Sequence, residues 1–224
     1  MDAHTLKYTL ETVYRRLLAA FGPQHWWPAE EPFEVIIGAI LTQSAAWVNV
    51  EKAIANLRKA EALSPAALRH LSPNELARLI RPSGYFNAKS RKLKALAVWL
   101  GEHYHDNLEK LFAVETGQLR RQLLAVHGIG PETADSIILY AAGKPVFVID
   151  AYTRRIISRL GPAPSRDSYT AYQALFMENL PPDAAMYNEY HALLVCLGKQ
   201  ACRTRPLCGH CCLSDLCGSC NSSG

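Results

Sequence analysis

The sequence predicts an all-α protein built as two helical lobes. Apolar residues recur at helical spacing through most of the chain, and no segment alternates apolar and polar residues convincingly enough to indicate a strand. Glycine and proline pairs stand where several of these helices would begin or end. With 224 residues, the chain is long enough for two small domains. We expect one continuous lobe over residues 31–145 and a second lobe combining residues 1–30 with 146–224.

The composition is typical of a soluble globular protein. The longest wholly apolar runs, such as the seven residues from Val35, are far too short to span a bilayer. The N-terminal segment interleaves acids and bases and does not resemble a secretory leader. The net charge of +4 permits nucleic-acid binding without requiring it. We therefore expect a cytosolic protein, associated with the nucleoid if it binds DNA, with no membrane partner.

The first half of the chain contains several helical patterns. One helix should run from Leu6 to Phe21 and end at Gly22-Pro23, followed by a loop that contains Trp26 and Trp27. A strongly apolar helix begins at Phe33, and another follows from about residue 49. The adjacent tryptophans are costly to leave in water, so their rings either fill a core or line a pocket.

Helix starts are marked in the middle of the chain. Ser64-Pro65 and Ser72-Pro73 each place an N-cap before a proline, and Ser72 with Glu75 forms a capping box. A turn at 81–84 leads into a long helix from about residue 88. Four basic residues lie near its start, and we expect most of them to form a solvated face: Lys89, Arg91, Lys92 and Lys94.

The stretch 119–156 carries the pattern that is most informative about function. A helix breaks at residues 127–130 and restarts at Pro131, which suits a first helical position. The backbone amides at this helix start would form an anion site. After a second helix, the run VFVID delivers one carboxylate, Asp150, just before another helix. The alternative is an ordinary turn between helices, with Asp150 as a cap. Further helices should end at Leu160 and span about 168–179 and 183–198.

All seven cysteines lie at the C-terminal end of the chain, from Cys196 onward. This crowding indicates a metal or cluster site rather than disulfides. Four thiolates on a short loop can hold a [4Fe–4S] cluster: Cys202, Cys208, Cys211 and Cys217. Zinc is the alternative, either at these residues or at the pairs Cys208/Cys211 and Cys217/Cys220. Cys212 could replace Cys211, whereas Cys196 should be a buried helix residue and Cys220 a thiol of the tail.

These motifs, in this order, resemble the endonuclease III (helix-hairpin-helix-GPD) superfamily of DNA base-excision glycosylases. The likeness covers almost the whole chain and includes LTQ at 41–43, PSGYFNAKSRKL at 82–93, the glycine hairpin, the VID aspartate and the cysteine loop. WWP followed by ILTQ and SGYFN is similar to the 3-methyladenine DNA glycosylases of endonuclease III type. Those enzymes generally lack the iron–sulfur loop, so the chain combines features of two branches.

The resemblance implies roles for particular residues. Asp150 would be the catalytic carboxylate that stabilises a cationic sugar and orients water. The hairpin would bind a DNA phosphate, and Gln43 would fill the gap left by the flipped base. The alternative for Gln43 is that it is a polar C-cap of its helix. The implied DNA-binding residues are Gln43, Gly128, Ile129, Gly130, Glu132 and Thr133. The implied base pocket is Trp26, Trp27, Pro28, Trp47 and Lys199, where Lys199 could instead be a surface or backbone-capping residue.

Glu132 is a departure from the bifunctional members, which carry a Schiff-base lysine at the corresponding position. We therefore expect a monofunctional, monomeric glycosylase acting on double-stranded DNA with a damaged base. Aromatic rings suit a cationic alkylated purine such as 3-methyladenine. The alternatives are a glycosylase for oxidised, deaminated or mismatched pyrimidines, and a non-catalytic DNA-binding iron–sulfur protein.

Overall fold

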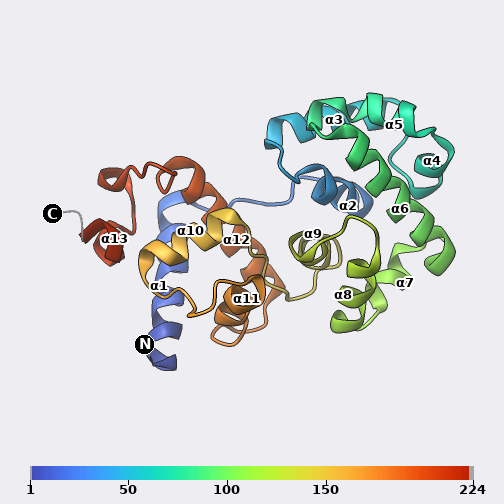
Figure 1. Ribbon diagram of the computed structural model, residues 1–224. Helices are drawn as coiled ribbons and strands as arrows, with labels where there is room; N and C mark the ends of the chain where they lie inside the picture. Colours follow the sequence, from blue (N-terminus) through green and yellow to red (C-terminus); the bar gives the residue numbers. More distant parts are fainter. Residues whose placement is uncertain (1, 222–224) are drawn as a thin grey trace. The chain divides into compact units, whose positions relative to one another are not determined.

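The computed structural model describes residues 2–221 as two compact units (Figure 1). One unit, called here the acid unit, joins the chain up to Trp26 to the chain from Pro145 onward. The other, the hairpin unit, spans Trp27–Lys144. From the sequence we expected the lobe boundaries after residue 30 and after residue 145. The boundaries between the two units instead lie between Trp26 and Trp27 and between Lys144 and Pro145. Met1 and residues 222–224, which belong to the second expected lobe, lie outside the described residues.

The fold class predicted from the sequence is confirmed, because residues 2–221 contain helices and no strand. The VFVID run is extended but pairs with no other strand in this range. The helices of the hairpin unit are α2 (Pro32–Leu41), α3 (Trp47–Lys59), α4 (Pro65–His70), α5 (Pro73–Leu79), η1 (Arg81–Ser83), α6 (Phe86–Tyr104), α7 (Leu108–Ala113), α8 (Thr116–Ala125), α9 (Pro131–Ser136) and the π-helical turn η2 (Ile137–Ala141).

The acid unit is made from the two ends of the chain. Its helices are α1 (Ala3–Phe21), α10 (Ala151–Leu160), α11 (Tyr169–Met177), α12 (Ala184–Gln200), η3 (Cys208–His210), η4 (Ser214–Leu216) and α13 (Gly218–Asn221). Helix α12 packs against both α1 and α10, so it joins the N-terminal helix to the C-terminal segment. No helix in the described part of the chain is long and apolar enough to cross a membrane.

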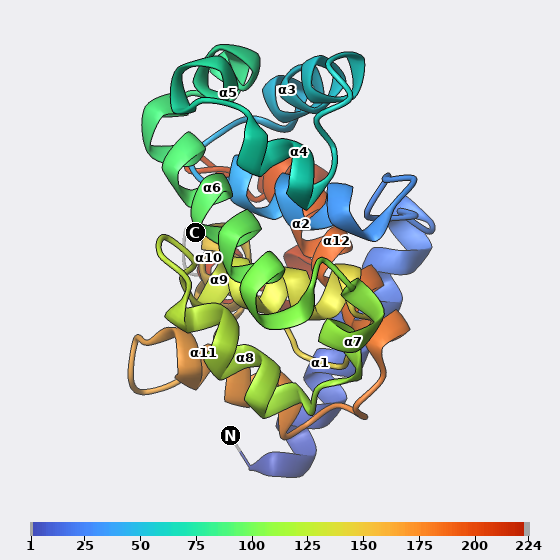
Figure 2. The same ribbon diagram turned by 90° about the vertical axis from the view of Figure 1, so that its right-hand side faces the viewer.

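Several helices begin or end at the capping residues that the sequence predicts. Helix α1 ends at Gly22, which adopts a φ of +68° that a side chain would disfavour. Ser64 and Ser72 cap α4 and α5, and Ser72 forms the expected reciprocal capping box with Glu75. These short helices pack against α6, whose length gives the hairpin unit its central element (Figure 2).

The expected solvated face on α6 is wrong for Lys89. Its side chain is buried, and its Nζ donates to the carbonyl oxygens of Leu41 (2.8 Å) and Ser83 (2.7 Å). Burial, together with the nearby charge of Lys92, lowers the pKa of Lys89 to about 8. The ammonium group is buried because it satisfies the carbonyl at the end of α2 and the turn of η1, a long-range contact that no local pattern reveals.

An aromatic core dominates the acid unit. The ring of Phe147 stacks on Phe176 with centroids 3.9 Å apart and packs edge-on against Tyr187 and Tyr190. Residues 146–149 are all buried, and the carbonyl oxygen of Phe147 accepts from Gln173 at 2.8 Å. This extended run therefore does not need a partner strand, because side-chain packing and a side-chain hydrogen bond hold it.

Candidate functional site

The glycine hairpin joins α8 to α9. Its turn is closed by Ile129 N–H donating to the Val126 carbonyl oxygen, while the side chains of both residues are buried. Gly128 has a φ of +82°, and a Cβ there would lie 2.3 Å from the Lys92 side chain. Gly130 has an ordinary φ of −94° and is exposed, with open space where a Cβ would be. The two glycines therefore serve different needs: Gly128 makes the turn, and Gly130 leaves the helix start accessible.

Gln43 connects this hairpin to the end of α2. Its Nε2 donates to the Gly128 carbonyl oxygen (3.2 Å) and to Thr133 Oγ1 (2.9 Å). Its Oε1 accepts from Lys92 Nζ on α6. The residue that caps α2 is Thr42, not Gln43. The Gln43 amide thus lies beside the proposed phosphate-binding amides, with its orientation fixed by three hydrogen bonds.

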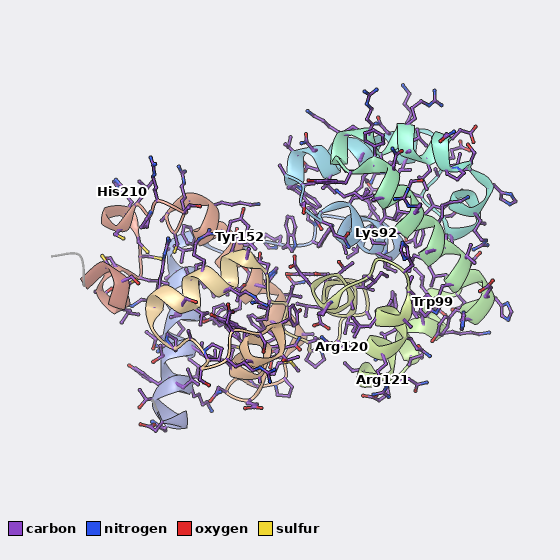
Figure 3. The ribbon with its side chains drawn as sticks, in the orientation of Figure 1. Lys92, Trp99, Arg120, Arg121, Tyr152 and His210 are labelled. Carbon is purple, nitrogen blue, oxygen red and sulfur yellow. The ribbon has the colours of Figure 1, made fainter. Side chains whose placement is uncertain are left out.

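An ion pair that sequence reasoning missed braces the two hairpin helices. Arg120 on α8 donates from Nε and Nη2 to the two carboxylate oxygens of Asp135 on α9, at 2.7 and 3.0 Å. The Asp135 side chain is 0% exposed, so this bidentate ion pair is largely removed from solvent. Arg120 and Lys92 are both labelled in Figure 3, on different helices of the hairpin unit. Spacing alone gave no signal for the pair, because the hairpin turn decides which faces of α8 and α9 meet.

Asp150 is the N-cap of α10, which is the structural role that the sequence offered as an alternative to catalysis. Its Oδ1 accepts from the Thr153 amide at 2.7 Å. The other oxygen, Oδ2, lies 3.8 Å from Nε2 of His191 on α12. The Asp150 side chain is 14% exposed, so it is largely buried yet still reaches solvent. Because capping occupies Oδ1, Oδ2 is the oxygen available for chemistry.

The predicted base-pocket residues fall in both units. In the hairpin unit, Trp27 makes an edge contact with Trp47 (centroids 5.2 Å apart) and packs against the position of Gly38. Tyr140 joins this aromatic group, with its ring centroid 5.5 Å from that of Trp27. Pro28 is exposed in the same unit. Trp26 is half-buried and Lys199 is exposed, and both belong to the acid unit.

Tyr140 was not anticipated from the sequence. It lies in η2, where the continuation of α9 widens into a π-helical turn packed against α2. Such turns are rare, and they alter the direction in which side chains leave a helix. The sequence ADSIILYAAG reads as a regular helix, so the available signal was only the presence of an aromatic residue after the hairpin.

The cysteine loop groups the four thiols that the spacing selects. Cys211 is partly buried, and its pKa is raised by that burial and by the neighbouring thiols of Cys202, Cys217 and Cys208. Cys212 instead has Cys196 and Arg16 among its electrostatic neighbours, besides Cys211. Cys196 is only half-buried on α12, where its sulfur accepts from Gln200.

Arg159 anchors the loop to α10. Its Nη1 donates to Cys202 Sγ at 3.4 Å, and its carbonyl oxygen accepts from the Cys217 thiol at 3.3 Å. Among the described residues, no group of three or more His, Cys, Asp or Glu side chains has the arrangement to hold a metal ion. By its chemistry, the donor set of four cysteines suits iron–sulfur ligation. Cys220 adds a fifth thiol, and the neighbouring Cys208 raises its pKa.

Comparison with known proteins identifies the family. The model of the HhH-GPD superfamily of base excision DNA repair proteins matches residues 37–182, which include the hairpin and Asp150. The chain belongs to this superfamily. A protein of Methanocaldococcus jannaschii, provisionally assigned as a DNA repair glycosylase, is 42% identical over 207 residues, which are 92% of this chain and 94% of that protein. Endonuclease III of Escherichia coli K12 is 29% identical over 188 residues, 83% of each chain.

Solved structures support the same assignment. The 3-methyladenine DNA glycosylase of Helicobacter pylori, bound to 1,N6-ethenoadenine, aligns with a TM-score of 0.72 at 27% identity, covering 89% of this chain and 98% of that one. An endonuclease III–DNA covalent intermediate aligns with a TM-score of 0.82 at 22% identity over 99% of this chain and 98% of that one, which shows a shared fold. The expected superfamily is therefore confirmed, and the chain is a DNA glycosylase of that superfamily with DNA as its partner.

Proposed function

We propose that this glycosylase is monofunctional and hydrolyses the N-glycosidic bond of a flipped, alkylated purine such as 3-methyladenine. The observation that carries the proposal is the placement of Asp150: a largely buried carboxylate with one oxygen held by the Thr153 amide and the other left for chemistry. As the bond breaks, positive charge develops on the deoxyribose. Asp150 stabilises that charge and orients the attacking water.

The hairpin holds the DNA in this proposal. A phosphate beside the lesion approaches the exposed start of α9 at Gly130, where no Cβ blocks it. Ile129 anchors the turn in the core, and the amides of Glu132 and Thr133 complete the anion site. Gln43 is hydrogen-bonded to the hairpin, and we propose that its amide fills the gap in the duplex when DNA binds there.

The aromatic group favours an alkylated purine. Trp27, Trp47 and Tyr140 offer electron-rich faces that attract a cationic base such as 3-methyladenine. The related H. pylori enzyme is a 3-methyladenine DNA glycosylase, which supports the same substrate class. Trp26, Pro28 and Lys199 are the other residues for which the family resemblance implies a pocket role, and Lys199 is the weakest candidate because its side chain is exposed.

The absence of a lyase step is proposed from Glu132. This exposed residue stands where bifunctional enzymes carry the lysine that forms an imine with the sugar. A carboxylate cannot form that imine. Borohydride added during turnover should therefore trap no covalent protein–DNA complex, and the abasic product should stay uncleaved until alkali is added. A trapped complex would contradict this part of the proposal.

A [4Fe–4S] cluster is the proposed cofactor, held by Cys202, Cys208, Cys211 and Cys217, with zinc as the alternative. When bound, it would supply a rigid cross-link for a loop that has little core of its own. Arg159 would support the same loop by its hydrogen bonds to Cys202 and Cys217. Iron and acid-labile sulfide in a brown purified protein would support the cluster, whereas zinc in a colourless protein would show that zinc is the cofactor instead.

A panel of duplexes tests the substrate. Each would carry one lesion: 3-methyladenine, 1,N6-ethenoadenine, uracil or thymine glycol. We expect excision of the alkylated purines by wild-type protein and none by Asp150→Asn. Excision of only uracil or thymine glycol would favour the alternative of a glycosylase for oxidised or deaminated pyrimidines. Tight binding of every duplex without excision would favour a non-catalytic DNA-binding protein.

A further inference from the structure

His191 is a buried titratable residue to which the proposed chemistry assigns no role. It lies on α12, which packs directly against α10, and it is 7% exposed. Its Nε2 is 3.8 Å from Asp150 Oδ2, the oxygen that does not cap α10. The neighbouring buried positions on the helix are apolar, including Ala192, Leu193 and Leu194. The Asp150 carboxylate therefore lies against a buried imidazole, where charge and hydrogen-bonding groups interact more strongly than in water.

Burial and the Asp150 carboxylate act in opposite directions on the pKa of His191. Burial lowers the pKa of His191, and Asp150 opposes this by raising the pKa. Four charged side chains of the helices packed around His191 bind other groups. On α10, Arg154 pairs with Asp167, and Arg155 donates to the carbonyl oxygens of Cys202 and Gly198. Arg16 of α1 pairs with Asp215, and Glu189 of α12 accepts from the Gln24 amide. The imidazole is therefore neutral near pH 7, with one N–H to donate.

We infer that His191 is a positioning residue for Asp150. The neutral imidazole directs an N–H at Oδ2 and fixes the plane of the carboxylate, while the Thr153 amide fixes Oδ1. A separation of 3.8 Å is too long for a direct hydrogen bond, and a small closure on binding DNA would bring the two atoms within range. Oδ2 has two lone pairs, so this contact leaves it free to face the sugar. The inference rests on the proposed role of Asp150 as the catalytic carboxylate.

Rate measurements test whether His191 acts through Asp150. In single-turnover excision of 3-methyladenine from a duplex, His191→Phe should lower the rate about 10- to 100-fold without weakening DNA binding. Losses of this size follow when a residue that orients a metal ligand is removed from a metal site. His191→Gln keeps an N–H donor and should recover part of the rate. In the Asp150→Asn background, His191→Phe should cost nothing further. A wild-type rate for His191→Phe, or an equal loss in both backgrounds, would overturn the inference.

A second measurement needs no substrate. The imidazole nitrogens of His191 can be titrated by NMR in the wild-type protein and in Asp150→Asn. Because the carboxylate raises the pKa of His191, its loss should lower that pKa further, whereas Asp183→Asn, which alters another helix cap of the same unit, should leave it unchanged. An unchanged His191 titration in Asp150→Asn would overturn the inference even if the variant His191→Phe failed to fold. If the wild-type protein excised no lesion, the proposed function would fail while this coupling remained measurable.

Discussion

The hairpin unit and the acid unit hold their functional groups in different ways. Around the hairpin, polar side chains bind backbone and one another: Gln43 with Gly128 and Thr133, and Arg120 with Asp135. In the segment before Asp150, aromatic packing holds the backbone in place: Phe147 packs against Phe176 and against Tyr187 and Tyr190 of α12. The difference suits two tasks. A phosphate grip needs oriented amides, whereas a carboxylate needs an environment from which water is largely excluded.

The largest effect should come from the acid unit. Asp150→Asn should lower single-turnover excision about 100- to 10,000-fold, because the neutral amide cannot stabilise the developing cation. Asparagine is also a good N-cap, so α10 and DNA affinity should be preserved. Asp183→Asn is the matched control, since Asp183 caps α12 in the same unit with its carboxylate. Equal losses in both variants would mean that capping alone explains the role of Asp150.

In the hairpin unit, the largest effect should fall on stability. Arg120→Met leaves the Asp135 carboxylate buried without its charge partner and should cost about 3 kcal/mol of unfolding free energy. Urea unfolding measures it. The double variant Arg120→Met/Asp135→Leu should recover much of the loss, because no buried charge is left. Glu11→Gln, which breaks an exposed pair with Lys7, should cost less than about 0.5 kcal/mol. A loss as small for Arg120→Met would contradict the proposed brace.

The two hairpin glycines should respond differently to the same substitution. Gly128→Ala forces a side chain into a φ of +82° and against Lys92, and should cost about 1 to 3 kcal/mol of stability. Gly130→Ala meets neither obstacle and should leave stability nearly unchanged while weakening DNA binding. Urea unfolding and fluorescence anisotropy with a labelled duplex separate the two effects. Unchanged affinity for Gly130→Ala would place the phosphate elsewhere.

The most gradual effect is a pH dependence in the hairpin unit. Lys89 has a folded pKa of about 8, below its usual 10.5, so between these values the unfolded chain binds more protons. Stability should therefore rise with pH across this window because of Lys89, by at most about 1.4 kcal/mol per pH unit. Subtracting urea unfolding curves of Lys89→Met from those of wild type isolates the contribution. A difference independent of pH would show that the ammonium group is not penalised by burial.

Much of the fold followed from local sequence. Serine caps, glycine ends and apolar periodicity placed the helices, because these signals act over a few residues and do not depend on tertiary packing. The expected solvated face of α6 failed at Lys89, whose partners Leu41 and Ser83 come from other elements. Tyr140 and the Arg120–Asp135 pair were missed for the same reason: a π-helical turn and a hairpin angle decide which side chains meet.

The sequence by itself determined the helical class, the hairpin with its exposed helix start, the single acid that ends VFVID and the order of motifs that marks the superfamily. Only the tertiary structure decided how those groups are held: that one Asp150 oxygen caps α10 while the other faces His191, and that Gln43 is fastened to the hairpin. The physical reason is range. Caps and periodicity are encoded within one turn of helix, whereas the partner of a buried polar group is chosen by packing between distant segments.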